Sequence, residues 1–273
     1  MLKKLPIKRF EEIYYLTSRL FIQLRRKPII LISGLIQPLL WLILFGCLFQ
    51  NLLLPFKETS VSYFQFFAPG IIIFTTFSGA LNAGLPLIFD KEFGFFNRLL
   101  VAPLISRFSI VFSATFFIVA TTLLQTIIII FTTSFFGAKI LNLIDLVFIL
   151  FIASLLIIGI TTLSICLAFS LPSHIEFLAV ILILNLPLLF TSTALAPLNL
   201  MPTWLQCITL LNPLSYAIEM IRHIYLHSVW NFNDHLLDIF YFSIDMKQSL
   251  FVLFLFDVII IYITQIILKK FLA

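Results

Sequence analysis

The chain has 273 residues, of which 62% are hydrophobic and only 11% are charged, and its formal net charge is +5. That composition excludes an ordinary water-soluble domain, in which about 25% of residues are charged. The positive charge would suit a nucleic-acid surface in a soluble protein, but here the basic residues flank apolar segments, which is typical of membrane proteins. We therefore expect a lipid membrane around the chain and no nucleic-acid partner.

Long stretches without charge dominate the sequence. Five intervals contain no Asp, Glu, Lys or Arg, and a sixth contains only Asp257: 28–56, 59–89, 108–138, 146–175, 177–218 and 248–268. A helix that crosses the roughly 30 Å hydrocarbon core of a bilayer needs about 20 mostly apolar residues. Each charge inside that layer costs at least about 2.5 kcal/mol. The pattern predicts an all-α membrane protein with six transmembrane helices.

The first helix in chain order is charged and precedes the apolar stretches. Over residues 8–27, apolar side chains recur at helical spacing beside basic ones, which predicts an amphipathic helix lying in the headgroup layer. A helix packed on a soluble partner would show the same pattern. We expect a cytoplasmic or stromal N-terminal segment, 1–28, followed by one transmembrane domain, 29–270.

The six expected spans cover approximately residues 29–49, 66–88, 109–135, 146–170, 176–195 and 249–268. In the first span Gln37 precedes Pro38, and we expect a kink there. A short polar loop separates the first two spans, a charged stretch (90–107) follows the second, and a polar loop (231–248) precedes the last.

Residues 196–230 are apolar but are interrupted by Pro197, Pro202 and Pro213. The segment between Pro202 and Pro213 would make about 15 Å of helix, which is half the hydrocarbon thickness. We therefore expect a short re-entrant helix that dips into the membrane without crossing it. A further outer helix is expected at about 213–228.

Six crossings place both termini on one side of the membrane, and the positive charges agree. In this arrangement thirteen Lys and Arg residues lie on the side of the termini, and four lie opposite: Lys57, Lys139, Arg222 and Lys247. Basic loops are retained on the cytoplasmic side, so both termini are expected to be cytoplasmic or, in a plastid, stromal.

The charged stretch after the second expected span is the first candidate site. Phe89, Phe93 and Phe96 share one helical face in a segment that carries both signs of charge. Such a segment suits a short amphipathic helix that docks on a cytoplasmic partner. A helix cap with aromatic membrane anchors would explain the same residues, and spacing alone does not separate the two interpretations.

A second candidate site follows the prolines. Glu219 and Arg222 are three residues apart on the expected helix, so their side chains can pair. Asn212 can cap that helix, and Pro213 suits its first position. The pair is either an ordinary ion pair that makes two charges tolerable at an apolar interface, or a gate or fold-setting element on the outer side.

Asp257 lies near the middle of the last expected span. A carboxyl group inside the membrane costs free energy, so it is usually present for a function, and Asp257 is a functional candidate. Tyr262 and Gln265 lie on the same helix, and Gln125 or Asn185 could approach from other spans. The alternative is a protonated or hydrogen-bonded packing residue.

The sequence predicts neither a metal site nor a catalytic centre. His223 and His227 have a spacing that can hold zinc, but no acidic or cysteine ligand joins them closely. The three cysteines, Cys47, Cys166 and Cys207, are far apart and give no disulfide or zinc framework.

Three parts of the sequence carry a pattern that resembles a known family, the ABC-2-type permeases, which are the membrane subunits of ATP-driven exporters. The parts are Gln37-Pro38 with Trp41 and Phe45-Gly46, then Pro69-Gly70 with Phe89–Gly94 and Arg98–Pro103, and then Asn212–Arg222. The resemblance covers about residues 8–270 and extends to plastid-encoded permeases of red-lineage algae, which the Phe- and Ile-rich composition fits. One departure is the segment 191–194, Thr-Ser-Thr-Ala, where relatives often carry glycine.

The resemblance implies a homodimer in which each copy binds a separate P-loop ATP-binding subunit. It implies coupling to the ATPase through Asp90, Lys91, Glu92, Gly94, Arg98, Pro103 and Arg107. It also implies a pathway or gate element made by Asn212, Pro213, Tyr216, Glu219 and Arg222. Gln37 and Asp257 are the intramembrane polar candidates. The sequence lacks the G-x-x-x-x-G-K-[ST] motif that holds ATP phosphates, so we expect no enzyme site and no cofactor in this chain.

The expected function is that of a permease that exports an amphipathic or lipid-like substrate along the dimer interface. That pathway is expected to be lined mainly by the first, second and fifth spans. The expected location is a plastid membrane, with a bacterial plasma membrane as the alternative. The alternative functions are a secondary transporter that uses Asp257 and a non-catalytic membrane assembly scaffold.

Overall fold

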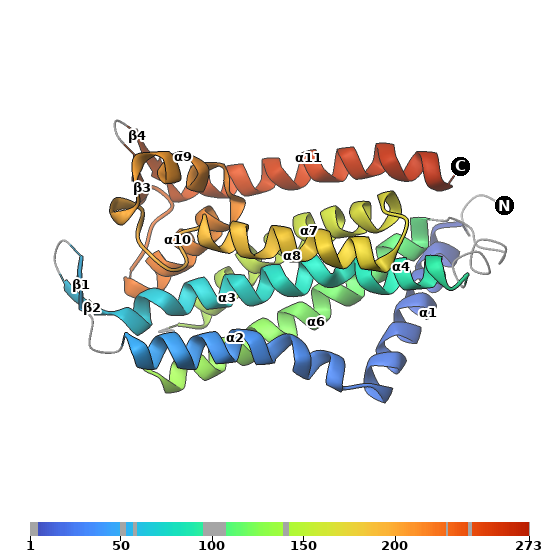
Figure 1. Cartoon of the computed structure of the whole chain (residues 1–273), viewed down its shortest axis with the longest axis horizontal. Helices are drawn as coiled ribbons and strands as arrows, with labels where there is room; N and C mark the ends of the chain where they lie inside the picture. Colours follow the sequence, from blue (N-terminus) through green and yellow to red (C-terminus); the bar gives the residue numbers. More distant parts are fainter. Residues whose placement is uncertain are drawn as a thin grey trace.

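Long helices that lie side by side build the molecule in the computed structural model (Figure 1). The structure describes residues 5–49, 53–56, 59–94, 108–138, 142–227, 229–239 and 242–272. The predicted class, an all-α membrane protein, is confirmed. Five helices among the described residues are long and apolar enough to cross a membrane: α2 (Ile29–Leu48), α3 (Tyr63–Leu81) with its continuation to Glu92, α6 (Phe108–Phe135), α7 (Leu143–Ser170) and α11 (Met246–Leu272).

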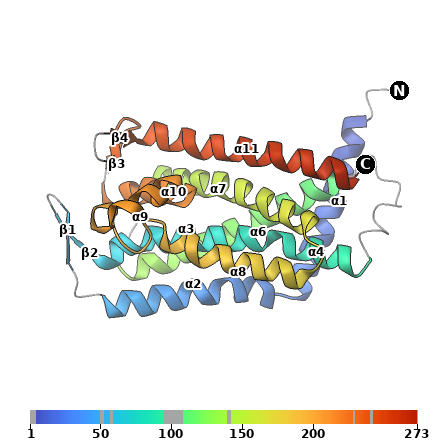
Figure 2. The same ribbon diagram turned by 45° about the horizontal axis from the view of Figure 1, so that its top comes forward.

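The sixth candidate span is α8 (His174–Phe190), which is apolar but shorter than the other five. Its 17 residues make about 25 Å of helix. The helix was expected to continue to about residue 195, but it ends at Phe190 and is followed by turns as far as Ala196. α8 runs along the bundle between α2 and α7 in Figure 2.

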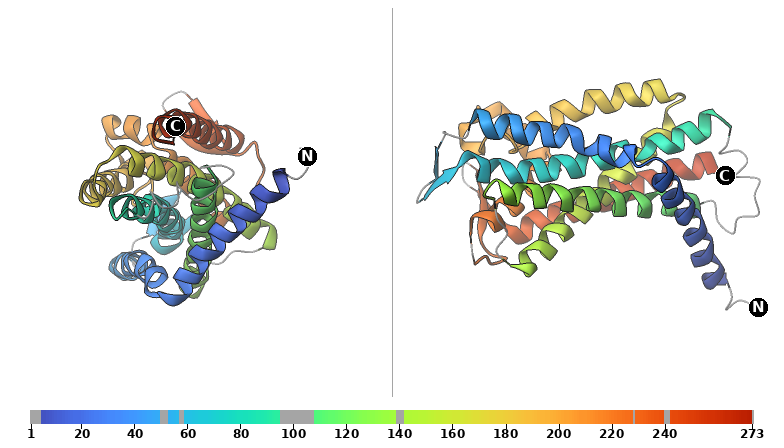
Figure 3. Two further views of the ribbon diagram at one scale, coloured as in Figure 1. Left: turned by 90° about the vertical axis from the view of Figure 1, so that its right-hand side faces the viewer. Right: turned by 90° about the horizontal axis from the view of Figure 1, so that it is seen from below.

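The two ends of the bundle differ in structure. At one end, here called the α1 end, α1 (Leu5–Arg26) crosses the ends of the long helices, and α11 ends at this same end of the bundle (Figure 3). At the opposite end, here called the hairpin end, lie two antiparallel hairpins, a short helix α9 (Thr203–Leu211) and α10 (Pro213–Leu226). The hairpins pair β1 (Leu53–Phe56) with β2 (Thr59–Ser62) and β3 (His235–Ile239) with β4 (Phe242–Asp245).

The amphipathic helix predicted at 8–27 is present as α1. It packs on α6, where the rings of Phe21 and Phe117 lie 5.1 Å apart and Ser109 Oγ donates a hydrogen bond to Glu12 at 3.2 Å. Phe10 and Tyr14, which belong to the predicted apolar stripe, are exposed instead of packed. An exposed aromatic edge beside basic residues suits a helix at the membrane surface, and that location stays a prediction.

The second span is interrupted once. After α3, the 3-10 helix η2 (Asn82–Gly84) leads into α4 (Leu85–Glu92). Ser164 on α7 explains the interruption, because its Oγ donates to Leu81 O at 2.5 Å and accepts from Gly84 N at 2.9 Å. A Cβ at position 84 would lie 2.5 Å from Ser164 O, so only glycine allows α7 to approach this closely.

The core of the bundle is α3. In its most apolar stretch 72% of the residues are buried, compared with 22% in α2 and 17% in α11. Large aromatic side chains fill the space around it, including the fully buried Phe66, Phe67, Phe74 and Phe77. Helices α2, α8 and α11 therefore present apolar side chains on the outside of the bundle, where lipid or a partner would contact them.

Candidate functional site

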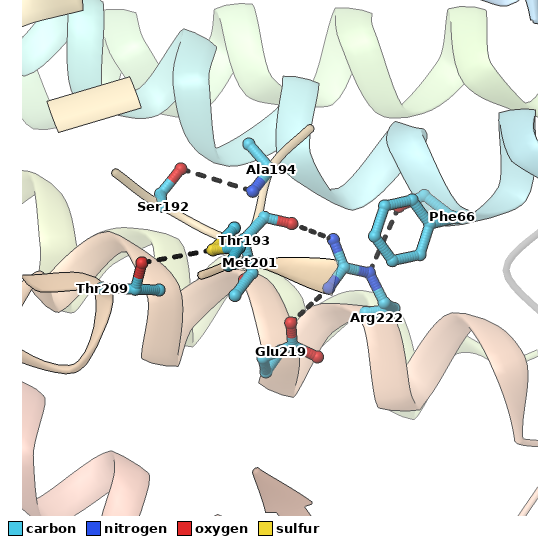
Figure 4. Close-up of polar contacts among 8 residues, drawn as sticks. All are labelled: Phe66, Ser192, Thr193, Ala194, Met201, Thr209, Glu219 and Arg222. Atoms are coloured by element: carbon cyan, nitrogen blue, oxygen red, sulfur yellow. Dashed lines mark hydrogen bonds and ion pairs between the residues drawn. The ribbon is translucent and has the colours of Figure 1, made fainter. Parts of the chain in front are cut away.

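A buried arginine joins three parts of the chain at the hairpin end (Figure 4). Arg222 on α10 is 3% exposed, and its guanidinium donates to Phe66 O on α3 at 3.2 Å and to Thr193 O at 2.5 Å. It also pairs with Glu219, one turn earlier on α10, and its Cζ lies 3.7 Å from the centre of the Phe66 ring. We call Phe66, Thr193, Glu219 and Arg222 the Arg222 cluster.

The Arg222 cluster provides hydrogen-bond and ion-pair partners for a guanidinium that is buried among apolar side chains. Burial lowers the pKa of Arg222 from its ordinary value, while the adjacent Glu219 carboxylate opposes that shift. An arginine keeps its proton under such conditions, and the planar guanidinium here finds one carboxylate, two carbonyl oxygens and an aromatic face. The predicted pairing of Glu219 with Arg222 is therefore present, and it fixes α10 to α3 and to the turns after α8.

Asn212 holds the beginning of α10 and the end of α8 together. Its Oδ1 accepts from Leu214 N at 3.0 Å, which is the predicted cap, and Pro213 occupies the first turn. Its Nδ2 donates to Leu188 O at 2.7 Å and to Thr191 Oγ1 at 3.3 Å. Sequence spacing could not show these last two bonds, because they join residues more than twenty positions apart.

Two tyrosines complete the hydrogen bonds around this region. Tyr216 on α10 donates from its hydroxyl to Leu210 O at 2.7 Å, and Tyr63 on α3 donates to Leu195 O at 3.4 Å. Burial raises the pKa of Tyr216 from its ordinary value, so its hydroxyl stays a donor at neutral pH. All five predicted residues of the C-terminal signature thus lie in one region, where they attach α9 and α10 to the bundle.

The turns after α8 contain no glycine, and the structure shows where the close approach is made instead. A Cβ at Gly70 on α3 would lie 2.8 Å from Ala194 O and 2.9 Å from Ala194 Cα. Ser192 Oγ donates to Leu189 O at 2.6 Å and accepts from Ala194 N at 3.3 Å, which stabilises the turn. The glycine that the contact requires is therefore on α3.

The short helix between the prolines does not cross the membrane, as predicted. α9 has nine residues, about 14 Å of helix. Trp204 and Leu211 are 65% and 86% exposed, so α9 covers the hairpin end with an apolar outer surface. The 3-10 helix η3 (Leu198–Leu200) precedes it.

At the α1 end, the described part of the predicted coupling stretch is the end of α4. Asp90 lies 3.5 Å from Arg19 of α1, Lys91 donates to carbonyls at the end of α7, and Glu92 contacts His174 at the start of α8. Gly94 has φ +74°, a conformation that favours glycine, and a Cβ there would meet nothing within 4 Å. Arg98, Pro103 and Arg107, and the predicted partner residue Phe96, lie outside the described residues.

The structure does not place the intramembrane polar candidates, Gln37 and Asp257, close to one another. Asp257 is 5% exposed and faces α7, where a Cβ at Gly159 would lie 2.1 Å from its Oδ1. Gln125, one predicted partner, instead donates to Leu31 O on α2 at 3.1 Å. Gln37 is exposed on α2 in the single chain. Asp257 therefore sits at a helix–helix contact and not beside the other candidates.

The predicted lining of the pathway by the first, second and fifth spans stays a prediction, and the three helices differ in how much surface they expose. α3 is buried within its own chain over most of its length, whereas α2 and α8 expose apolar faces. Exposed side chains on these two helices include Leu40, Leu44, Leu182, Leu186 and Phe190. The exposed apolar surface of the single chain thus includes faces of α2 and α8, and also of α6 and α11, whereas α3 contributes little to it.

A histidine–aspartate contact at the hairpin end was missed because its members come from separate elements. His223 Nε2 on α10 lies 3.0 Å from Asp234 Oδ2, which also accepts from Asn231 N at 2.7 Å. The Asn231 backbone N–H and His223 lower the pKa of Asp234, and burial lowers the pKa of His223. Among the described residues, no three His, Cys, Asp or Glu side chains gather as a metal ion would require.

A tryptophan anchors the same region to α7. Trp230 Nε1 donates to Asp145 Oδ1 at 2.8 Å, and its ring stacks on Phe148 with centroids 4.7 Å apart. Asp145 lies in the first turn of α7, where a carboxylate is favoured by the helix dipole. The contact fixes the segment after α10 against the beginning of α7.

Comparison with known proteins agrees with this architecture. Residues 11–226 match the family described as ABC-2 type transporter. The chain is 55% identical over 262 residues to the transport permease ycf38 of Cyanophora paradoxa, a match that covers 95% of this chain and 90% of that protein. It is 51% identical to ycf38 of Porphyra purpurea, with 95% and 89% covered.

A more distant relative comes from a bacterium. Over 214 residues the chain is 25% identical to the daunorubicin resistance ABC transporter permease DrrB1 of Streptomyces coeruleorubidus, covering 76% of this chain and 72% of that protein. The family match spans the α1 helix, the α4 segment and the Arg222 cluster described above. The chain therefore belongs to the ABC-2 type transporter family and is a membrane permease subunit of an ABC transporter.

Proposed function

We propose that two copies of this chain form an export pathway in a plastid membrane, powered by a separate P-loop ATP-binding subunit on the stromal side. The relatives named ycf38 from two algae support the plastid location. The relative named for daunorubicin resistance supports export as the direction. The termini are assigned to the stromal side from the distribution of positive charges.

The observation that carries the proposal is the difference between the two ends of the bundle. The α1 end holds a basic amphipathic helix, with Arg25 and Arg26 in its last turn, beside the charged end of α4. The hairpin end holds a re-entrant element attached by the Arg222 cluster. A charged face for an ATPase at one end, and a short apolar helix attached by a buried ion pair at the other, fit a permease that is driven from the α1 end.

The exposed faces of α2 and α8 support an amphipathic or lipid-like substrate. Their outward residues are mostly Ile and Leu, and Ser33 and Gln37 are the exposed polar residues on α2. A small hydrophilic ion would need a polar lining, since unpaired charges in an apolar passage are costly. A second copy would cover part of these faces and leave an apolar passage between the two chains.

The test is affinity purification of the full chain in mild detergent. We expect a P-loop ATPase to co-purify in a one-to-one ratio with the permease. A chain that purifies without any ATPase, under conditions that preserve its fold, would contradict the proposal.

The substrate class is tested separately on the reconstituted complex. Its ATP hydrolysis should be stimulated by amphipathic compounds and lipids. A response confined to small hydrophilic solutes would refute the lipid-like substrate while leaving the ATP-driven mechanism intact.

A further inference from the structure

Two adjacent charged residues at the end of α4 both reach the connection between α7 and α8. Lys91 Nζ donates to Phe169 O at 3.0 Å and to Leu171 O at 2.9 Å. Carbonyl groups at a helix C-terminus lack partners within the helix and attract cations. Lys91 therefore binds the end of α7 from a different helix.

Glu92 binds the start of α8 in the complementary way. Its Oε2 accepts from the backbone N–H of His174 at 3.1 Å and lies 2.6 Å from Nδ1 of the same residue. The Phe89 ring covers the His174 ring at 5.0 Å between centroids. Helix N-termini favour a carboxylate acceptor, so Glu92 supplements the cap that Ser173 provides.

We call the contacts of Phe89, Lys91 and Glu92 with residues 169–174 the α4 latch. Hydrogen bonds to a charged group are roughly twice as strong as neutral ones, and the α4 latch contains several of them within one helical turn. These bonds attach the last turn of α4 both to the C-terminal end of α7 and to the first residue of α8.

The opposite end of α8 is also attached. Leu188 O accepts from Asn212, and Thr193 O, three residues beyond α8, accepts from Arg222. Between these ends, only Phe177, Ile181 and Leu189 of α8 are buried, whereas α3 is enclosed by the bundle. A displacement at the α1 end therefore meets less resistance from α8 than from α3.

We propose that the α4 latch makes α8 move together with the end of α4, so that α8 carries ATP-driven displacement to the Arg222 cluster. This inference rests on the proposed function, because the displacement must come from an ATPase bound at the α1 end. It assigns Glu92 a positioning role within the permease instead of a direct contact with the ATPase.

The test is a distance measurement by pulsed electron paramagnetic resonance on the ATPase–permease complex in lipid. Spin labels are placed on exposed positions of α8 and α11 with Glu176→Cys and Gln265→Cys, after replacing Cys47, Cys166 and Cys207 by alanine. An excess of unlabelled chain makes distances within one chain dominate. We expect trapping with ATP and vanadate to shift the α8–α11 distance.

Three further variants separate the α4 latch from other roles of the same residues. Glu92→Ala should abolish the ATP-dependent shift while the ATPase stays bound. Glu92→Gln should keep the shift, because its amide oxygen still accepts from His174 N. The matched control Asp245→Ala removes an aspartate–histidine contact of the same 2.6 Å length at the hairpin end, and it should also keep the shift.

Each other outcome overturns the inference. The reference chain is the spin-labelled chain without further substitutions. With the ATPase bound, transmission through the α4 latch is excluded if the α8–α11 distance of the reference chain does not shift on trapping, or if Glu92→Ala shifts as much as the reference chain. Loss of ATPase binding in both Glu92 variants would place Glu92 at the ATPase surface and leave the proposed function standing. If no variant and no reference chain binds an ATPase, the proposed function fails and the inference fails with it.

Discussion

At the scale of single residues, the Arg222 cluster shows what local spacing can and cannot reveal. The pairing of Glu219 with Arg222 follows from their separation by three positions on a helix. The contacts with Phe66 O and Thr193 O could not be predicted, because they join Arg222 to residues 156 and 29 positions away. Their location depends on how the whole bundle packs.

The first prediction concerns the buried charge of this cluster. Arg222→Met should destabilise the protein by about 3–5 kcal/mol, because it leaves the Glu219 carboxylate partly buried without its partner. The double variant Glu219→Gln with Arg222→Met should be destabilised less than the single variant. Thermal unfolding in detergent measures both, and equal losses in the single and double variants would contradict the assigned pairing.

The second prediction concerns the glycine contacts. Gly84→Ala should destabilise the fold by about 1–3 kcal/mol, because the new Cβ would lie 2.5 Å from the backbone oxygen of Ser164. Gly46→Ala is the matched control, because its Cβ would meet only the Phe64 ring, at 2.9 Å, and a side chain can rotate away. If unfolding measurements showed the Gly46 change to be the costlier one, the assigned approach of η2 to α7 would be wrong.

At the scale of elements, charge-free intervals predicted the helices because a membrane span depends on composition more than on distant contacts. The third span was expected at 109–135 and is found at Phe108–Phe135. The 3-10 interruption at Asn82–Gly84 was missed because Ser164, which causes it, lies on another helix. Both hairpins were missed for a related reason, since strands of four or five residues are too short to show a hydrophobic period.

The third prediction is the pH dependence of the segment that follows α10. The folded protein lowers the pKa of both His223 and Asp234, so the unfolded chain binds more protons than the folded one as the pH falls. Stability should therefore be complete above about pH 6.5, the ordinary histidine value, and should decrease below it because of His223. It should decrease further below about pH 4, the ordinary aspartate value, because of Asp234.

The measurement for the pH prediction is the unfolding temperature in detergent between neutral pH and about pH 3, which passes below the ordinary aspartate value. His227 and Glu219 also lie near His223, so the variant Asp234→Asn isolates the aspartate. That variant should flatten the lower part of the profile. A wild-type protein that became more stable on acidification in this window would show that the assigned direction is wrong.

At the scale of the whole molecule, the sequence predicted the all-α membrane class and a helix between the prolines that is too short to cross a membrane. That this helix dips into the membrane, and that the second span lines the pathway, stay predictions, and the structure encloses α3 in the centre of the bundle. An apolar helix has a similar composition whether its neighbours are lipid or protein, so the burial of α3 could not be deduced from its composition. We propose the exposed faces of α2 and α8 as the surfaces on which two copies and a substrate meet.

The most direct test of the account asks which end of the bundle meets an ATPase. A photoreactive phenylalanine analogue is placed at Phe93, beside α4, or at Val229, near the hairpin end, because the two positions are 76% and 78% exposed. The account predicts that irradiation cross-links a P-loop ATPase to the chain labelled at position 93 and not to the chain labelled at position 229. Capture from position 229 alone, or from neither position while the chain is folded in its membrane, would contradict it.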